Sequence, residues 1–431
     1  MTTKRCDVAV VGAGMAGMAA SLFAAERGLS CIELGNSSSL AFGSGLLDLL
    51  GVHPVGDRRM WRSPFEALAA LGHDEPDHPL ARVDPASIRT ALATFVAALA
   101  CARLPYSELG DANRNVATAI GTIKTTFGVP RSMTPGVTAL HETRPCLVVG
   151  FRGLREFSAR QFVQALNACW PGLREACVAF PGLETAPELH ALHLARALDE
   201  RDACERTIRV IRPLLGGAEA VGVPAILGIS RAAETHAEFE RELGVPVFEI
   251  PMMPISVPGM RLRMALETAV TTRGVQRHHR AIVRSIAFGA DGATLDFADG
   301  GGAQSERVAV KAVILATGRF AGGGLVAGRD RVREPILDLA VEQPGSRDAW
   351  QRDDFLDPSG HPINRAGVRT DLAWRPLGAG GDVASPRLFA AGSLLARQDW
   401  MRAKCGAGLA IATAWAATRA AARALGASVE R

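Results

Sequence analysis

DVAVVGAGMAGMAA, residues 7–20, joins an apolar run of strand length to a G-x-G-x-x-G motif and an alanine-rich helical pattern. In such a unit Gly12 permits the tight turn out of the strand, Gly14 lets the backbone approach a phosphate, and Gly17 lets the helix pack on the strand. The free N–H groups and the dipole at the start of the helix then face an anion. An ordinary turn between a strand and a helix is the alternative, but the flanking patterns favour a nucleotide or flavin site.

The pattern around this motif is β-α-β. It predicts strands over 6–11 and 30–34, with a helix over 15–27 between them that ends at Gly28. A unit of this kind is the first part of a Rossmann-like parallel sheet.

The end of the second strand bears on the identity of the cofactor. In dinucleotide-binding folds an acidic residue there accepts hydrogen bonds from the adenosine ribose. Flavoproteins usually carry it at the position that is Gly35 here, and Glu33 lies two residues earlier on the same side of the strand. Glu33 either reaches a ribose or is simply a strand-end charge. The ribose contact separates FAD from FMN, which has no adenosine ribose.

The composition is that of a globular protein with room for two domains. The chain has 431 residues, of which 48% are hydrophobic and 21% are charged. No apolar run approaches the roughly 20 residues that cross a bilayer, and the first residues lack a signal-peptide pattern. We therefore expect a cytoplasmic protein without a transmembrane segment, which meets a membrane only peripherally, through partners.

Charge and cysteine usage exclude two classes of protein. The net charge is +4, but the basic residues are dispersed and there is a single tyrosine, so we expect no nucleic-acid surface. The eight cysteines form no C-x-x-C pair, so we predict neither an iron–sulfur cluster nor another metal site in this chain. Cys405 precedes a predicted helix and is a candidate redox thiol, with an inert core thiol as the favoured alternative.

Two later stretches repeat the plan of a buried strand followed by small residues. Residues 308–318 end in Ala-Thr-Gly, and residues 387–393 read RLFAAGS. A long alanine-rich helix to about residue 425 then begins after the segment 404–408, KCGAG. Because ligands bind at the carboxyl ends of parallel strands and helix N-termini stabilise negative charge, we expect these segments to join the site. A simple tight turn after each strand is the alternative.

A glycine- and serine-rich loop, Phe42-Gly43-Ser44-Gly45, completes the candidate site, because its N–H groups could cradle a phosphate or a flavin edge. A plain surface loop is the alternative there. The candidate flavin cradle consists of small residues from distant parts of the chain: Gly12, Gly14, Gly17, Ser44, Thr317, Gly318, Gly392, Ser393 and Gly406.

The segment between the two chain ends carries further strand and helix patterns, including a strand at 146–151 and a second strand at the apolar run 225–228, which a helix follows. We therefore predict an α/β fold in which residues 1–51 and 261–431 form one Rossmann-like flavin-binding domain. Residues 52–260 would be an inserted α/β cap domain that contacts the substrate.

The two chain ends together resemble the succinate dehydrogenase/fumarate reductase and glutathione reductase class of flavoproteins. More closely, the chain resembles the B subunits of anaerobic glycerol-3-phosphate dehydrogenases along nearly its full length. The stretches that carry this resemblance are 10–17, 42–50, 121–123, 149–154, 254–261, 316–326, 333–337, 367–371 and 389–393. The glycine-rich run over 316–326, followed by Arg333-Glu334-Pro335-Ile336, is the most specific of them.

The resemblance implies a flavoprotein subunit that acts with a catalytic A subunit and an iron–sulfur C subunit. Such a complex oxidises sn-glycerol 3-phosphate to dihydroxyacetone phosphate and passes electrons to menaquinone, in glycerol metabolism and anaerobic respiration. The resemblance also implies FMN as the cofactor, with FAD as the alternative, and the glycine at position 35 agrees with FMN. The family's glycine-rich run before the last helix is altered here by Lys404 and Ala407, which leaves the flavin contacts of that segment open.

The residues themselves do not single out a catalytic base, so the catalytic residues are unknown from the sequence. Five histidines are candidates without supporting spacing: His141, His236, His278, His279 and His361. Arg319, Arg333 and Arg369 could hold a phosphate, although dispersed arginines usually form surface ion pairs. We therefore expect a subunit of a flavin-dependent glycerol-3-phosphate:quinone oxidoreductase that relays electrons while its partner performs the chemistry. The rival hypotheses are a stand-alone flavin oxidoreductase and a structural subunit that has lost its flavin.

Overall fold

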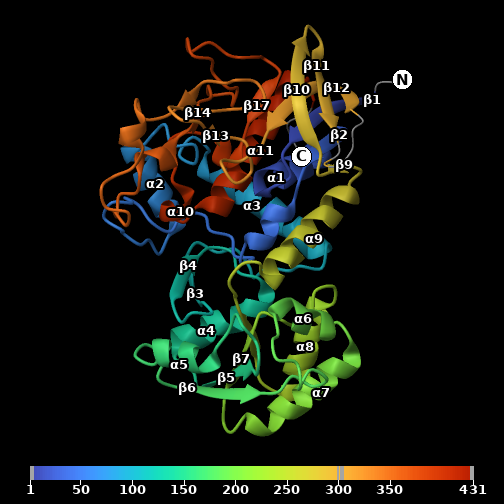
Figure 1. Ribbon diagram of the computed structural model, residues 1–431, viewed down its shortest axis with the longest axis vertical. Coiled ribbons are helices and arrows are strands. Elements are labelled where there is room, and N and C mark those ends of the chain that lie inside the picture. The colour runs from blue at the N-terminus through green and yellow to red at the C-terminus, as the bar shows by residue number, and fades with distance from the viewer. Residues whose placement is uncertain (1–3, 299, 301–304, 428–431) are drawn as a thin grey trace. The chain divides into compact units, whose positions relative to one another are not determined.

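The computed structural model describes residues 4–298, 300 and 305–427 (Figure 1). The chain forms two compact units, each with its own parallel sheet. The large unit comprises Met1–Ser39, Asp48–Ala98 and Leu266–Arg431, and the small unit comprises Leu40–Leu47 and Leu99–Ala265. Neither unit is a single continuous segment of the chain.

A seven-stranded sheet forms the centre of the large unit. Its parallel part has the order β12-β1-β2-β9, formed by Ser305–Leu315, Lys4–Val11, Cys31–Gly35 and Gln276–His279. β17 (Leu388–Ala390) pairs in parallel with the end of β12, and the hairpin of β10 (Ile282–Gly289) and β11 (Gly292–Ala298) pairs antiparallel with its beginning. Strands from both chain ends therefore lie side by side, with Val11 of β1 opposite Leu315 of β12 and Leu34 of β2.

Helices α1 (Met15–Glu26) and α11 (Gly406–Ala424) pack against each other beside this sheet (Figure 1). The ring of Phe23 meets that of Trp415 edge-on at 4.9 Å, and the guanidinium of Arg27 lies 4.1 Å over the same tryptophan. Both helices are rich in alanine, which lets their backbones approach closely. Strands covered in this way are apolar where they are covered, as the second halves of β1 and β12 are.

The other elements of the large unit are short. α2 (Pro64–Asp74) begins after Ser63, whose side chain accepts the N–H of Glu66, and has proline in its first turn. Two small sheets and one short helix follow later in the chain: β13 (Val326–Ala327) with β14 (Val332–Arg333), β15 (Val341–Glu342) with β16 (Gly367–Val368), and α10 (Trp400–Ala403). α3 (Pro85–Cys101) and α9 (Val257–Thr271) each contain a boundary between the units.

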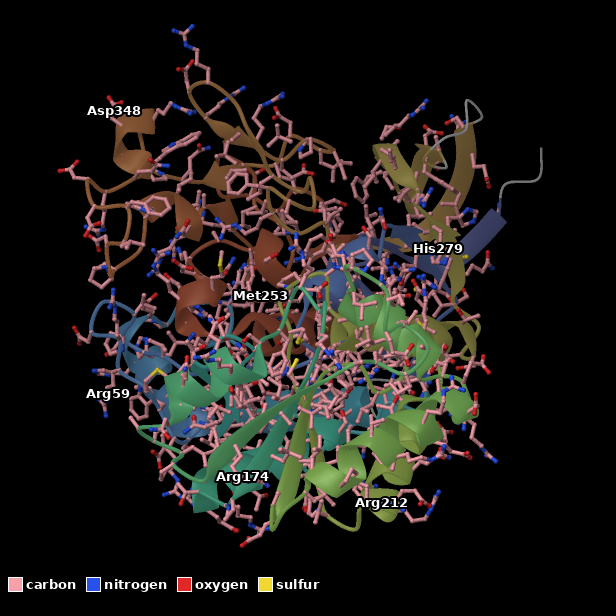
Figure 2. All side chains as sticks on the ribbon, turned by 60° about the horizontal axis from the view of Figure 1, so that its bottom comes forward. Arg59, Arg174, Arg212, Met253, His279 and Asp348 are labelled. Atoms are coloured by element: carbon pink, nitrogen blue, oxygen red, sulfur yellow. The ribbon has the colours of Figure 1, made fainter. Side chains whose placement is uncertain are left out.

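The small unit contains a four-stranded parallel sheet of order β6-β5-β7-β8, formed by Leu173–Val178, Cys146–Phe151, Ala220–Pro224 and Val247–Ile250. Its helices are α4 (Thr134–Glu142), α5 (Ala159–Leu166), α6 (Ala191–Ala197), α7 (Arg201–Ile211) and α8 (Ala232–Leu243), and β3 (Arg114–Ala117) pairs with β4 (Ile123–Thr126). Every residue of β5, β7 and β8 is buried. Figure 2 shows charged side chains such as Arg174 and Arg212 reaching outward from this unit.

The strand expected at 225–228 is wrong. β7 ends at Pro224, and the next four residues form the loop that follows it. The N–H of Leu227 donates to the carboxylate of Glu249 at 2.8 Å instead of joining a strand ladder. An apolar run was therefore read as a strand where it is a buried loop.

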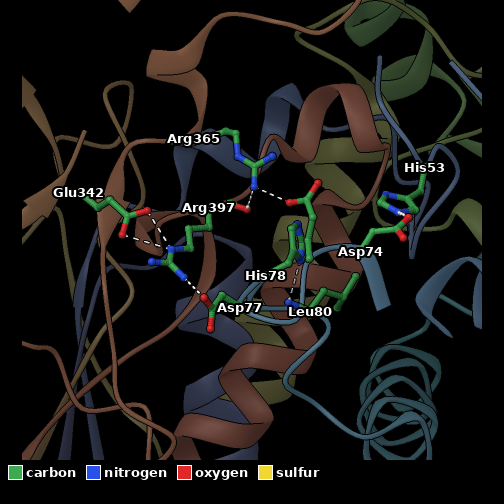
Figure 3. Close-up of polar contacts among 9 residues, drawn as sticks. His53, Asp74, Asp77, His78, Leu80, Glu342, Arg365 and Arg397 are labelled. Carbon is green, nitrogen blue, oxygen red and sulfur yellow. Dashed lines mark hydrogen bonds and ion pairs between the residues drawn. The ribbon is translucent and has the colours of Figure 1, made fainter. Parts of the chain in front are cut away.

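Ion pairs bind part of the expected cap segment to the C-terminal half of the chain, inside the large unit (Figure 3). Arg397 pairs with Asp77, and its Nε lies 2.9 Å from Oε1 of Glu342. Arg365 pairs with Glu75. The partners in the Arg397–Asp77 and Arg365–Glu75 pairs are 290 or more residues apart in sequence.

The units therefore divide differently from the expected cap domain over 52–260, because residues 52–98 lie in the large unit and residues 40–47 in the small one. His78 contributes to the packing of this segment. Burial lowers its pKa to about 4, so the ring is neutral at pH 7, and its Nδ1 accepts the N–H of Leu80 at 3.1 Å.

The predicted α/β class, with a Rossmann-like unit whose sheet is assembled from both chain ends, is confirmed. Among the helices that the structure describes, none is long and apolar enough to cross a membrane.

Candidate functional site

The glycine-rich turn lies where the two chain ends meet. Gly12 has φ +110°, and a Cβ there would lie 2.2 Å from the carbonyl oxygen of Ala316. The N–H of Ala316 donates to the carbonyl of Val11 at 2.8 Å. Glycine at position 12 is therefore required by its backbone conformation and by the closeness of the chain after β12.

Gly17 and Gly14 lie in the same turn but have different surroundings. A Cβ on Gly17 would lie 1.7 Å from the carbonyl oxygen of Gly12, so only glycine lets α1 pack onto the turn. A Cβ on Gly14 would have one neighbour within 4 Å, Oγ of Ser39 at 3.7 Å. The space beside Gly14 is open to a ligand. No side chain caps the start of α1, so its first N–H groups can bind an anion.

The ends of β12 and β17 lie next to this turn. Gly392, with φ +78°, is so close to α1 that a Cβ would lie 2.5 Å from Cβ of Ala16. Its N–H donates to Oγ1 of Thr413 on α11 at 2.8 Å. Oγ of Ser393 lies 3.8 Å from the position that a Cβ on Gly318 would take. The carboxyl edge of the sheet thus brings together Gly12, Gly14, Gly17, Thr317, Gly318, Gly392 and Ser393.

The hydroxyl of Thr317 is a polar atom in need of a partner. Its Oγ1 is buried and makes no hydrogen bond with the described residues. Buried hydroxyls are normally hydrogen-bonded. A polar ligand at the carboxyl edge of the sheet would supply the missing partner.

The start of α11 is the second helix N-terminus in this region of the large unit. Gly406 opens the helix, and a Cβ there would lie 2.9 Å from the ring of Trp400. The N–H of Gly408 donates to the carbonyl of Asp48 at 2.7 Å, and a Cβ on Gly408 would lie 2.7 Å from Cα of Leu49. The role of Gly408 was missed, although the G-x-G spacing at 406–408 is the signal that could have identified it.

Ser44 belongs to the small unit, whereas the other eight predicted cradle residues belong to the large one. Its Oγ accepts the N–H of Leu46 at 3.4 Å. The predicted part of Ser44 in the cradle stays a prediction.

Glu33 is held by a neighbouring strand. It is 2% exposed and pairs with Arg277 of β9, whose Nε lies 3.0 Å from its Oε1. Its Oε2 is buried without a hydrogen-bond partner among the described residues. Burial raises the pKa of Glu33, and the charge of Arg277 offsets this only in part. A Cβ on Gly35 would lie 2.7 Å from the N of Ala13, so a side chain has no room at the position where an acid was expected.

The hypothesis of a redox thiol at Cys405 is wrong. The side chain is fully buried, and burial raises the pKa of the thiol well above its ordinary value. A thiol that is neither exposed nor ionised is a poor nucleophile. Desolvation by the surrounding core outweighs any effect of the helix start.

Five of the candidate basic residues make structural contacts. His236 is buried with Nε2 2.7 Å from the carbonyl of Val247, and Nδ1 of His361 accepts the N–H of Arg352 at 3.1 Å. His278 packs edge-on against a phenylalanine. Arg319 donates to two backbone carbonyls, and Arg369 lies 3.6 Å from Glu342. The geometry adds no support for any of these residues as a base or a phosphate ligand.

The residues of the large unit fit a flavin nucleotide. An open space beside Gly14 at a helix N-terminus suits a phosphate, and the unpaired hydroxyl of Thr317 suits a polar group of the cofactor. The start of α11 would favour negative charge on a reduced flavin ring.

Comparison with known proteins gives the same answer. The FAD binding domain family matches residues 7–409. The chain is 33% identical to a probable anaerobic glycerol-3-phosphate dehydrogenase B subunit of Halobacterium salinarum, covering 97% of this chain and 98% of that protein. It is 29% identical to the anaerobic glycerol-3-phosphate dehydrogenase B subunit of Vibrio cholerae, covering 95% and 94%, and to that of Pectobacterium atrosepticum, covering 95% and 97%.

Two solved structures that match the chain have TM-scores below 0.5. A 3-ketosteroid delta1-dehydrogenase from Sterolibacterium denitrificans has a TM-score of 0.45 at 12% identity and covers 98% of this chain and 100% of its own. An E. coli quinol fumarate reductase has a TM-score of 0.42 at 10% identity and covers 99% and 72%. With the family match over 7–409 and the full-length relatives, the chain is a flavin-binding oxidoreductase of the FAD binding domain family and belongs to the anaerobic glycerol-3-phosphate dehydrogenase B subunits.

Proposed function

We propose that this protein is the flavin-bearing B subunit of an anaerobic glycerol-3-phosphate dehydrogenase. The complex would oxidise sn-glycerol 3-phosphate to dihydroxyacetone phosphate and pass the electrons to a quinone. The observation that carries the proposal is the glycine turn that closes against the chain after β12, beside a free helix N-terminus, in a chain whose full-length relatives are named as the B subunit of this enzyme.

Each part of the cradle has a role in this proposal. The N–H groups at the start of α1, reached past Gly14, would hold a phosphate of the cofactor. Thr317, Gly318, Gly392 and Ser393 would line the carboxyl edge of the sheet, with the start of α11 at the flavin ring. A bound flavin would supply the acceptor for a hydride. A part for Ser44 in the cradle and a cap role for residues 52–260 remain predictions from the sequence.

The contacts of the candidate histidines give no support for one of them as the base that takes the proton of the substrate hydroxyl. His236 is buried against the carbonyl of Val247, His361 accepts a backbone N–H, and His278 packs against a phenylalanine. We therefore place the chemistry of the substrate in a catalytic A subunit and electron transfer to the quinone in an iron–sulfur C subunit. Through these partners the protein would lie at the inner face of the cytoplasmic membrane.

The surroundings of Glu33 bear on whether the flavin is FMN or FAD. FMN is favoured by the lack of room for a side chain at Gly35 and by the pairing of Glu33 with Arg277, which together leave no exposed acid for a ribose at the end of β2. FAD is favoured by the family match and by the unpaired Oε2 of Glu33, which could accept a hydrogen bond from a ribose hydroxyl. Chromatography of the cofactor released from the purified protein decides between them.

Substitution of the cradle glycines tests the site. Gly14→Val should fold, because φ is −77° and the space is open, but its side chain would take the place of the phosphate and flavin should be lost. Gly345→Val is the matched control, since a Cβ there meets nothing within 4 Å, and it should keep its flavin. Visible absorption measures the flavin content, and circular dichroism checks the fold. A full flavin content in folded Gly14→Val would contradict the proposed site.

The rival functions give different results in the same preparation. Anaerobic addition of sn-glycerol 3-phosphate should bleach the flavin in the complex with the A subunit and leave it oxidised in the isolated chain. Bleaching of the isolated chain would indicate a stand-alone oxidoreductase. A folded, colourless wild-type protein that takes up neither FMN nor FAD would indicate a structural subunit.

A further inference from the structure

The small unit has a parallel sheet of its own, and no residue of this sheet takes part in the proposed flavin site. In such sheets ligands bind outside the carboxyl ends of the strands. β5 comes first in the chain, with β6 on one side and β7 on the other. β5 ends at Phe151 and β6 at Val178.

A cavity of about 470 Å³ lies at this carboxyl edge. Its lining includes Arg152, which directly follows β5, the end of β6, and one side of α7 with Arg206 and Arg209. Val178 and Val210 form an apolar part of the cavity wall. The volume lies in the range of small-molecule sites, about 300–1,000 Å³.

Two of the three arginines are uncommitted. Arg152 and Arg209 are exposed and make no hydrogen bond or ion pair through their side chains within the described part of the chain. Other arginines of the small unit, visible in Figure 2, are engaged. Arg174 donates to the carbonyl of Leu215, and Arg212 pairs with a glutamate at 2.9 Å.

The acidic groups around the cavity leave a positive balance. Arg206 pairs with Asp202 on its own helix. Glu184 also lines the cavity, and its carboxylate is turned toward the N–H of Gly182, from which it accepts a hydrogen bond at 2.9 Å. The charged side chains that line the cavity are three arginines and one glutamate, so a dianion would be bound with a net favourable charge even though Arg206 also pairs with Asp202.

We propose that this cavity binds an organic phosphomonoester. The phosphate would lie between the guanidinium groups of Arg152, Arg206 and Arg209, whose planar donors match phosphate oxygens in pairs. The organic part of the ligand would lie against Val178 and Val210. The proposal does not depend on the flavin site, because all of these residues belong to the small unit.

Titration calorimetry of the full-length protein tests the charge and the body of the ligand separately. Phenyl phosphate has both a phosphate group and an apolar ring. Inorganic phosphate has only the charged group, phenol has only the ring, and succinate is a dianion whose two carboxylates differ in geometry from a phosphate. Phenyl phosphate should bind more tightly than inorganic phosphate, and its affinity should fall with added salt. Phenol should not bind. Tighter binding of succinate than of phenyl phosphate would overturn the assignment to phosphate.

Variants locate the binding. Arg209→Ala should weaken phenyl phosphate at least about tenfold, the loss expected for a charged hydrogen-bonding partner. Arg160→Ala is the matched control, because Arg160 is an equally exposed arginine of the same unit outside the cavity, and its affinity should be unchanged. Glu184→Gln should strengthen binding by removing a negative charge. Equal weakening in the Arg209 and Arg160 variants would overturn the proposal, since it would indicate general charge screening.

A thiol in the cavity gives an independent readout. Cys177 lines the cavity and is exposed, and Cys169 is an exposed cysteine of the same unit outside it. Phenyl phosphate should slow alkylation of Cys177 by iodoacetamide and leave Cys169 unchanged, as mapped by mass spectrometry. Alkylation of Cys177 at an unaltered rate under saturating phenyl phosphate would place the ligand elsewhere.

Discussion

The two units each bury a glutamate against an arginine, and they do so in different ways. In the small unit Glu249 is fully buried and meets Arg261 through two hydrogen bonds, at 2.5 and 2.9 Å. Leu227 N–H and Ser132 Oγ donate to the same carboxylate at 2.8 and 2.7 Å. Each carboxylate oxygen of Glu249 therefore accepts two hydrogen bonds.

The pair in the large unit is less complete. Glu33 receives one hydrogen bond of 3.0 Å from Arg277, and its second oxygen is buried without a partner among the described residues. Arg277 is shared with Glu267, 3.5 Å away. The carboxylate of Glu33 therefore gives up water without recovering all of its hydrogen bonds.

The pKa values of the two glutamates diverge for this reason. Burial favours the protonated form of both. At Glu249 the charge and hydrogen bonds of Arg261, with those of Leu227 and Ser132, outweigh burial and hold the pKa below its ordinary value. At Glu33 burial prevails and the pKa is raised. An arginine pairs with both glutamates, but the larger number of donors at Glu249 accompanies the lowered pKa.

Removal of the arginine should give the largest difference between the units. Arg261→Met leaves Glu249 buried without its counter-charge and should cost about 3–5 kcal/mol in unfolding free energy. Arg277→Met should cost clearly less, because Glu33 can take up a proton. Native-state hydrogen exchange followed by mass spectrometry, on peptides of β8 and of β2, measures each unit by itself. Equal losses in the two variants would contradict the comparison.

Neutral replacement of the acids should give a smaller difference in the same direction. Glu249→Gln keeps the shape of the side chain but loses charged hydrogen bonds, and should cost about 1.5–3 kcal/mol. Glu33→Gln should cost less than about 1 kcal/mol, because the carboxylate it replaces is incompletely paired. The same exchange measurement applies. A greater loss for Glu33→Gln would indicate a partner for its Oε2 in the folded protein.

The pH dependence of stability should have opposite sign in the two units. The lowered pKa of Glu249 adds stability above the unfolded pKa of about 4.5, and this is lost as the pH falls through the folded value. The raised pKa of Glu33 makes the folded state bind a proton more tightly, so its penalty is relieved as the pH falls from neutral towards that same unfolded value. Exchange of β8 peptides between about pH 6 and pH 3, compared in wild type and Glu249→Gln, should lose its acid sensitivity in the variant.

Removal of a single donor should give the smallest effect. Ser132→Ala deletes one of the four hydrogen bonds to Glu249 and should cost about 1 kcal/mol. It should also raise the pKa of Glu249, so that the small unit begins to lose stability at a higher pH than in the wild type. Unchanged acid unfolding in this variant would mean that Arg261 alone sets the pKa.

The local sequence was sufficient to predict a structural feature wherever that feature depends on neighbours in the chain. The G-x-G-x-x-G turn follows from three glycines within six residues, and the structure shows why two of them have no room for a Cβ. The strands and helices at the chain ends lie close to their expected bounds because their apolar periodicity is strong. The apolar run at 225–228 has the composition of a strand but is a loop, and the N–H of Leu227 in it donates to Glu249, 22 residues further along the chain.

The amino-acid sequence by itself determined the βαβ start, the α/β class and the small residues that line the carboxyl edge of the large sheet. Only the tertiary structure decided that residues 52–98 join the large unit, through ion pairs between segments about 300 residues apart, and that Cys405 is an inert core thiol. It also decided the directions in which the pKa values of Glu33 and Glu249 are shifted. The physical reason is common to all three: burial and distant donors set these properties, and neither is visible in the spacing of residues along the chain.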